Sequence, residues 1–293
     1  MITPELVSYI KQQIQIGKSK EEITQALLAQ NWHQNDIDQG LAQASSDAPL
    51  PNAGELPKAG QIFNEAWEIY KKHFKTLVIL SLIPTAVVTI LIALFVGGGI
   101  AGVVLKINTQ ALGAVGIVLG IIAFVFAIYL SLWGGVAQLY AIKDRAEAIN
   151  WKEAFKRSKH KIGAFFTTSL LSTLAILGGF ILLVIPGIIF ALWFSQSSYV
   201  VVEENLQSAE ALKRSKHYVQ GRLGMVFGKV FYIVIITIGL FFLLGFILGF
   251  IQASAGMKEG SLSWMETVFS IIWTPLPLIY GYLLYNYLRA GRP

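Results

Sequence analysis

Five long stretches of the chain contain no Asp, Glu, Lys or Arg, and each is rich in apolar residues. A helix needs about 20 apolar residues to cross a bilayer, and continuous apolarity excludes the alternating strands of a membrane barrel. One stretch contains Pro186-Gly187, which predicts two helices joined by a tight turn. The stretches are Thr76–Leu105, Ile107–Ile142, Ile162–Val202, Val230–Met257 and Thr267–Leu288. They predict six transmembrane helices, near residues 74–97, 112–141, 162–184, 187–203, 225–252 and 264–288.

The polar region before these spans predicts a small separate module. Residues 1–44 are expected to form three short helices with their own core, and the Pro-containing segment 45–58 is expected to be a linker. Residues 59–293 then form the six-span domain. The apolar positions that could close the core of the module are Leu6, Tyr9, Ile10, Ile14, Ile23, Leu27, Leu28, Trp32, Ile37 and Leu41.

An internal repeat precedes the pairs of spans. The motif E-A-x-K-R-S-K-H occurs at residues 153–160 and 210–217, and residues 65–72 are a looser copy. Each copy can form an amphipathic helix in the headgroup layer, with aromatic residues facing the membrane and basic residues facing water. Because each unit then holds one such helix and two spans, successive units enter the membrane in the same sense. The fold class predicted is therefore all-α, with three parallel hairpins each preceded by an interfacial helix.

Composition and charge support a membrane protein and fix its expected orientation. Only 14% of the residues are charged, against about 25% in soluble domains. With six spans, 21 of the 23 Lys and Arg fall on one side, and only Lys106 and Lys258 fall on the other. The positive-inside rule then predicts that both termini are cytoplasmic. We expect a multi-pass protein of the inner (plasma) membrane, whose net charge of +6 serves topology and not nucleic-acid binding.

The basic ends of the repeat are candidate contacts for lipid headgroups. Lys and Arg near an anionic leaflet contribute about 1 kcal/mol each. General attraction and topology setting are the alternative explanation of the same residues. The candidates are Lys156, Arg157, Lys159, His160, Lys213, Arg214, Lys216 and His217.

A second candidate site is a polar patch in the second hairpin. Interhelical hydrogen bonding is the simpler interpretation of such side chains, and a small cavity for a headgroup or solute is the other. The patch residues are Ser169, Ser172, Thr173, Gln196 and Ser197, with further Ser and Thr beside them.

The candidate chemistry is otherwise sparse. The middles of the spans hold no Asp, Glu, His, Lys or Arg, which proton relays and coupled ion sites usually need. The chain has no Cys and no G-x-S-x-G, P-loop or H-E-x-x-H motif. We expect no enzymatic activity, no metal and no cofactor. Hydrolysis of a lipid headgroup by Glu203 and Glu204 with His160 and His217 is the weakest alternative.

Two resemblances add to this interpretation. The segments Ile185-Pro186-Gly187-Ile188-Ile189, Tyr199-Val200-Val201-Val202-Glu203 and Ala211-Leu212-Lys213-Arg214-Ser215 resemble the membrane domain attached to some bacterial glycerophosphoryl diester phosphodiesterases. The resemblance covers roughly residues 58–288 and implies a helical membrane domain without the catalytic domain. Residues 17–32 resemble modules of the ubiquitin-associated (UBA) type, which implies protein–protein docking.

These observations predict a bacterial-type, non-enzymatic membrane scaffold or accessory protein. It would contact anionic lipid through its basic segments and dock a cytoplasmic partner through residues 1–44. The alternative function is passive or lipid-substrate transport through the polar patch of the second hairpin.

Overall fold

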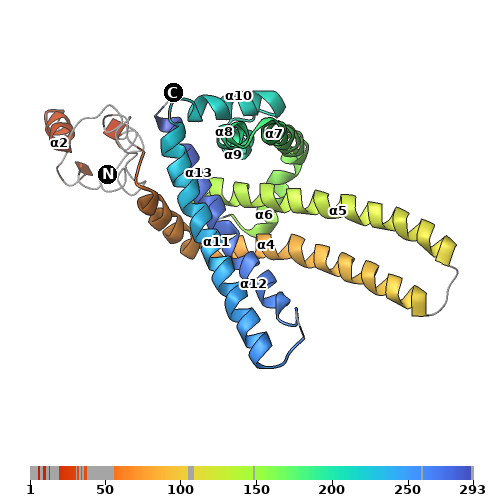
Figure 1. Cartoon of the computed structure of the whole chain (residues 1–293). Coiled ribbons are helices and arrows are strands. Elements are labelled where there is room, and N and C mark those ends of the chain that lie inside the picture. The colour runs from red at the N-terminus through yellow and green to blue at the C-terminus, as the bar shows by residue number, and fades with distance from the viewer. Residues whose placement is uncertain are drawn as a thin grey trace. The chain divides into compact units, whose positions relative to one another are not determined.

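The structure is a computed structural model. It describes residues 6, 9, 10, 13, 20–30, 32, 34, 36, 37, 56–104, 109–147, 149–258 and 260–291, and no side chain within 20–21, 98–104 or 109–115. The described residues form helices and contain no strand (Figure 1). The chain divides into two compact units, one of Met1–Pro57 with Asn286–Pro293 and one of Lys58–Tyr285.

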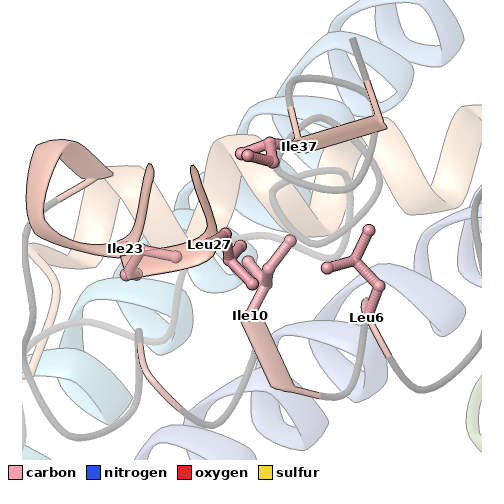
Figure 2. Packing of buried hydrophobic residues seen from close by; sticks show 5 residues of the cluster. All are labelled: Leu6, Ile10, Ile23, Leu27 and Ile37. Carbon is pink, nitrogen blue, oxygen red and sulfur yellow. The ribbon is translucent and has the colours of Figure 1, made fainter. Parts of the chain in front are cut away.

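The first unit contains a small buried cluster of apolar side chains. Leu6, Ile10, Ile23, Leu27 and Ile37 are each no more than 2% exposed (Figure 2). Tyr9 and Trp32 pack against this cluster. Ile23 and Leu27 lie one turn apart on α2 (Lys20–Leu28), so that they share a face. Leu28 was expected in this core, but it is 42% exposed, because it is turned about 100° around α2 from Leu27. Ile14 and Leu41 lie outside the described residues.

In the described part of the chain, six helices are long and apolar enough to cross a membrane. Their bounds are Ala59–Gly97, Gly116–Lys143, Trp151–Leu182, Val184–Glu203, Leu223–Ser254 and Ser263–Ala290. Large apolar side chains remain exposed along them, as at Leu94, Phe124 and Phe242, which is the surface that a lipid environment accommodates. The predictions of an all-helical chain and of six helices able to cross a membrane are confirmed, and they indicate a multi-pass membrane protein.

The first pair of helices is the longest. α4 (Ala59–Val104) lies against α5 (Thr109–Lys143) (Figure 1). The backbone of His73 leaves the helical region, so α4 consists of a shorter helix up to this kink and a longer one after it. The two long helices approach each other closely where Gly134 faces the ring of Pro84. A Cβ at position 134 would collide with that ring, and the absence of a side chain on glycine allows this approach.

The second pair is α7 (Ile162–Leu182) and α8 (Val184–Phe194), which pack on each other. Leu183 is extended and breaks the helix. The sequence placed this turn at Pro186-Gly187, but both residues lie inside α8. Pro186 is accepted there because the N–H groups of the first turn have no helical acceptor. Gly187 lets the backbones of the pair meet, since a Cβ on Gly179 would lie 3.0 Å from its Cα.

Short helices precede the second and third pairs. After α5, the chain forms η1 (Arg145–Glu147) and then α6 (Trp151–Ser158), which leads through η2 (Lys159–Lys161) into α7. α9 (Ser197–Glu203) continues α8 after a break, and α10 (Ser208–Val219) packs against α7, α8 and α9. Gly221, at φ +83°, ends α10 in the left-handed region that favours glycine.

The third pair is α11 (Leu223–Ser254) with α12 (Ser263–Trp273), and α13 (Pro275–Ala290) continues α12. Pro275 begins α13, where its missing N–H costs no helical hydrogen bond. Leu276, Ile279 and Tyr280 of α13 are completely buried. The part of α13 within the second unit is thus at the centre of the packing.

Candidate functional site

The two full copies of the repeat place equivalent residues in equivalent environments. Ala154 and Ala211 are fully buried, and so are Ser158 and Ser215. The two serine hydroxyls donate to backbone carbonyls, of Phe155 in one copy and of Trp193 in the other. Each short helix therefore packs through its Ala and Ser face and exposes its basic face.

Each repeat arginine forms an ion pair with an acidic residue that directly follows an earlier helix. Arg157 Nη1 lies 2.8 Å from Asp144 Oδ2, just after α5. Arg214 Nε lies 2.8 Å from Glu204 Oε2, just after α9. Arg157 also pairs with Glu147 and Glu153. In the looser copy Ile69 occupies the arginine position. Arg157 and Arg214, expected as headgroup contacts, are thus engaged within the protein.

Glu204 is the most elaborately bound carboxylate of this group. Its Oε1 accepts hydrogen bonds from the hydroxyls of Tyr218 at 2.7 Å and Tyr285 at 2.8 Å, while Arg214 binds Oε2. Burial raises the pKa of Glu204, but the hydrogen bonds from Tyr218, Tyr285 and Arg214 outweigh it, and the pKa is lowered. Glu204 therefore links α9, α10 and α13 as a charged group.

The lysines of the repeat are not equivalent to its arginines. Lys156, Lys159 and Lys213 are exposed. Lys216 lies over the ring of Trp193, with its Nζ 4.0 Å from the ring centroid. A lysine ammonium can reach solvent or a headgroup from such positions. The structure thus divides the basic candidates into three exposed lysines, one lysine on an aromatic ring and two arginines in ion pairs.

The two repeat histidines are exposed and each lies beside an aromatic ring. His160 lies edge-on to Tyr140, and His217 is tilted against Tyr218. Among the described residues, no three His, Asp or Glu side chains form a group that could hold a metal ion.

The polar patch predicted in the second hairpin is spread over separate contacts. Ser169 and Ser172 are half-buried on α7, Thr173 is exposed, and Gln196 and Ser197 are buried at the break between α8 and α9. Ser197 Oγ donates to the Phe194 carbonyl at 2.8 Å.

Neighbours of this patch bind α10. The backbone N–H of Gln196 donates to Ser215 Oγ, and the N–H of Ser208 donates to Thr168 Oγ1 at 2.7 Å. Gln196 Nε2 donates to Ser195 Oγ, but Gln196 Oε1 is buried without a hydrogen-bond partner in the part of the chain described. These contacts join α7, α8 and α10.

A cavity with a mixed apolar and polar lining, which the sequence did not predict, lies elsewhere in the second unit. It has a volume of about 590 Å³ and is formed by α4, α5, Tyr199 of α9 and the junction of α12 with α13. Gln138, 6% exposed, donates from Nε2 to Oγ of Ser81, which is 7% exposed. The lining residues are Leu80, Ser81, Pro84, Thr85, Val88, Thr89, Ser131, Gly134, Gly135, Gln138, Tyr199, Ser270, Ile271, Thr274, Pro277 and Leu278.

The sequence does carry a signal for this cavity. Ser81, Thr85 and Thr89 recur every four residues on one face of α4, and Gln138 is an amide within an apolar span. Each alone is typical of helix packing, because Ser and Thr in a membrane helix bond to their own backbone. Their convergence with residues of α12 and α13 depends on the tertiary fold.

Comparison with known proteins finds no matching family model, and neither the curated proteins nor the solved structures include a match to this chain. The two resemblances noted in the sequence therefore stay expectations.

Proposed function

We propose that the protein is a non-enzymatic membrane accessory protein that holds anionic lipid headgroups against α6 and α10. One observation carries the proposal. In both full copies of the repeat the arginine is engaged inside the protein, while Lys156 and Lys213 at the preceding position are exposed. The same motif thus joins a structural cation to a cation that faces outward.

The physical basis is the attraction between exposed ammonium groups and an anionic leaflet. Each lysine near such a surface contributes about 1 kcal/mol, and Lys159 adds a third exposed ammonium group. The proposal includes α6 and α10 lying in the headgroup layer, three parallel hairpins, and both termini in the cytoplasm. The proposal also assigns the protein to a bacterial-type inner membrane, and the positive-inside charge distribution supports the cytoplasmic side for the termini.

The test measures which lipids stay bound when all three exposed lysines are neutralised. The protein would be placed in nanodiscs of mixed phosphatidylglycerol and phosphatidylcholine, and the retained lipids counted by native mass spectrometry. The triple variant Lys156→Gln, Lys159→Gln, Lys213→Gln should lose its preference for phosphatidylglycerol, by roughly fivefold per lysine.

The matched control is Lys258→Gln. Lys258 is also exposed, but the proposed topology would put it at the opposite face of the membrane. It should leave the preference unchanged. Equal loss in the control and the triple variant, or no loss in either, would refute a headgroup site at the repeat.

The second part of the proposal is that residues 1–44 dock a cytoplasmic protein. The buried cluster around Ile23 and Leu27 gives this segment a hydrophobic core, and a folded segment can present a binding surface to a partner. Deletion of residues 1–57 should leave membrane insertion intact and remove the proteins that co-purify after crosslinking. An unchanged set of crosslinked partners would end this part of the proposal while leaving the lipid site untouched.

A second candidate function is passive or lipid-substrate transport through the second hairpin. It is favoured by Gln196 Oε1, which is buried without a hydrogen-bond partner among the described residues. Replacing Gln196 and Ser169 with apolar residues should then change flux or lipid binding while the melting temperature is kept. A variant that only loses stability would favour packing as the role of this patch.

A further inference from the structure

Seven residues that line the cavity between α4, α5 and α12–α13 carry a hydroxyl group, and six of the seven donate to backbone carbonyls; Ser131 forms no hydrogen bond within the described residues. A hydroxyl has one hydrogen to donate and two lone pairs to accept with. The six hydroxyls that already donate can therefore serve a ligand only as acceptors. The bonds are Ser81 to Leu77, Thr85 to Ser81, Thr89 to Thr85, Ser270 to Thr267, Thr274 to Ser270, and Tyr199 to Leu278.

Two backbone carbonyls and one amide oxygen add to these acceptors. Pro84 has no N–H, so the carbonyl of Leu80 loses its helical donor. The carbonyl of Ile271 lies in the last turn of α12, which ends at Trp273, and therefore has no helical donor either. Leu80 and Ile271 both line the cavity. Gln138 gives one of the two hydrogens on Nε2 to Ser81, and no described residue donates to its Oε1. Acceptors around the cavity thus outnumber the donors that remain on Gln138 and Ser131, so a ligand with several hydrogen-bond donors fits this set.

The charge of the lining argues against an ionic ligand. Among the residues that form the cavity there is no Asp, Glu, Lys, Arg or His. An anion would meet acceptors without a compensating cation, and a cation would lack a carboxylate. Either would carry the cost of an unpaired charge at membrane depth. An uncharged polar group is what this set of atoms accommodates.

The size and the opening of the cavity point to a lipid. A volume of about 590 Å³ lies within the roughly 300–1,000 Å³ typical of small-molecule sites. Thr89, Ser131 and Thr274 on its rim are exposed, and they lie within helices that are apolar enough to span a membrane. Beside Thr89, the side chain of Ile90 is 57% exposed. A molecule can therefore enter sideways and leave an acyl chain along the apolar surface of α4.

From these features we infer that the cavity binds the head of an uncharged lipid that carries free hydroxyl groups, such as a monoacylglycerol. The hydroxyls donate to Gln138 Oε1 and to the oxygens of Thr85 and Thr274, and the acyl chain lies among the membrane lipids. This site uses none of the basic residues of the repeat, so it holds whether or not the lipid-headgroup function proposed above is correct.

The experiment compares two probes with the same acyl chain. Monoolein has two free hydroxyls, and methyl oleate has none. The intact protein would be purified in an amine-oxide detergent, whose head has no hydroxyl to occupy the cavity. Binding is measured as the rise in melting temperature on titration and as retention in native mass spectrometry. Monoolein should bind about tenfold more tightly than methyl oleate, the difference expected for one to two hydrogen bonds.

Two variants test the location of the site. Gln138→Leu removes the free acceptor and should weaken monoolein binding about tenfold. Ser131→Phe fills the exposed rim without disturbing a buried hydrogen bond, so it keeps the test valid if Gln138→Leu fails to fold. Ser254→Ala is the matched control, because Ser254 is exposed on α11 and is part of neither the cavity nor the polar patch of the second hairpin. The control should bind monoolein as the unmodified protein does.

Several outcomes would overturn the inference. Equal binding of the two probes would show that the cavity recognises only apolar chains. Monoolein binding that survives both Gln138→Leu and Ser131→Phe would place the site elsewhere. Stabilisation by sodium chloride but not by choline chloride, with no effect of monoolein, would instead indicate a cation among these oxygens.

Discussion

The ion pair between Arg214 and Glu204 offers the sharpest test of the packing that the repeat controls. Replacing Arg214 with Met keeps most of the aliphatic length and removes the guanidinium. Glu204, whose side chain is 12% exposed, is then left with only the hydroxyls of Tyr218 and Tyr285. The perturbation thus leaves a largely buried carboxylate without its cation.

The expected loss can be worked out from the contacts. A hydrogen bond to a charged group contributes about 1.5–3 kcal/mol. Because the Arg214 side chain is 36% exposed, solvent screening places its contribution at the lower end. Arg214 also lies over the ring of Tyr218, 4.8 Å from the ring centroid, which adds about 0.5–1 kcal/mol. Arg214→Met should therefore lower the free energy of unfolding by about 2–3 kcal/mol.

The pH dependence provides a second readout of the same contact. The pKa of Glu204 in the folded protein is below its ordinary value of 4.5. Its contribution to stability is thus complete above pH 4.5 and is lost as the pH falls through the folded-state pKa. Without Arg214, one of the three hydrogen bonds that lower the pKa of Glu204 is lost, so burial raises this pKa. The acid loss of stability should then begin at a higher pH in Arg214→Met than in the unmodified protein.

The assay is thermal unfolding in detergent, followed by tryptophan fluorescence at neutral pH and in a series below pH 4.5. Lys213→Met is the matched control, because Lys213 is the preceding residue on α10 and is exposed. The control should unfold like the unmodified protein. An Arg214→Met protein that matches the control in stability and in its acid profile would refute this account of the repeat.

Two further predictions use pairs of matched substitutions. Gly134→Ala should lower the free energy of unfolding by about 1–3 kcal/mol because the new methyl group overpacks against Pro84. Gly135→Ala should be tolerated, because its methyl group meets nothing within 4 Å. Thermal unfolding of the two variants is the measurement, and equal stability would contradict the close approach of α4 and α5 at Gly134. In the first unit, Ile23→Ala should lower the free energy of unfolding by about 2–5 kcal/mol and speed hydrogen exchange along α2, because Ile23 is fully buried. Leu28→Ala is the control, because Leu28 is exposed. Equal exchange rates in the two variants would contradict the buried cluster.

The spans could be predicted because the evidence for them is local. Apolar length and the absence of charge are properties of consecutive residues, and a membrane helix satisfies its own backbone hydrogen bonds. The break in the third apolar stretch was predictable for the same reason. Its position was not, because Pro186 is tolerated in the first turn of α8 and the chain turns at Leu183 instead.

The roles of the basic residues could not be separated from the sequence. Lys156 and Arg157 are neighbours and carry the same charge, so a charge pattern treats them alike. What distinguishes them is that Arg157 faces Asp144 at the end of α5 while Lys156 faces outward. That difference depends on how α6 packs on α5, which no local pattern contains.

By itself, the amino-acid sequence determined which segments are apolar enough for a membrane, where charge is concentrated, and that a motif repeats. These properties follow from residue type and spacing. The tertiary structure alone decided which cations form ion pairs and where oxygen atoms gather into a cavity. Thr85 and Thr274 are far apart in the chain, and they line one space because α4 packs near the junction of α12 and α13. The physical reason is that hydrogen bonding and ion pairing depend on distances in space, which the order of residues does not state.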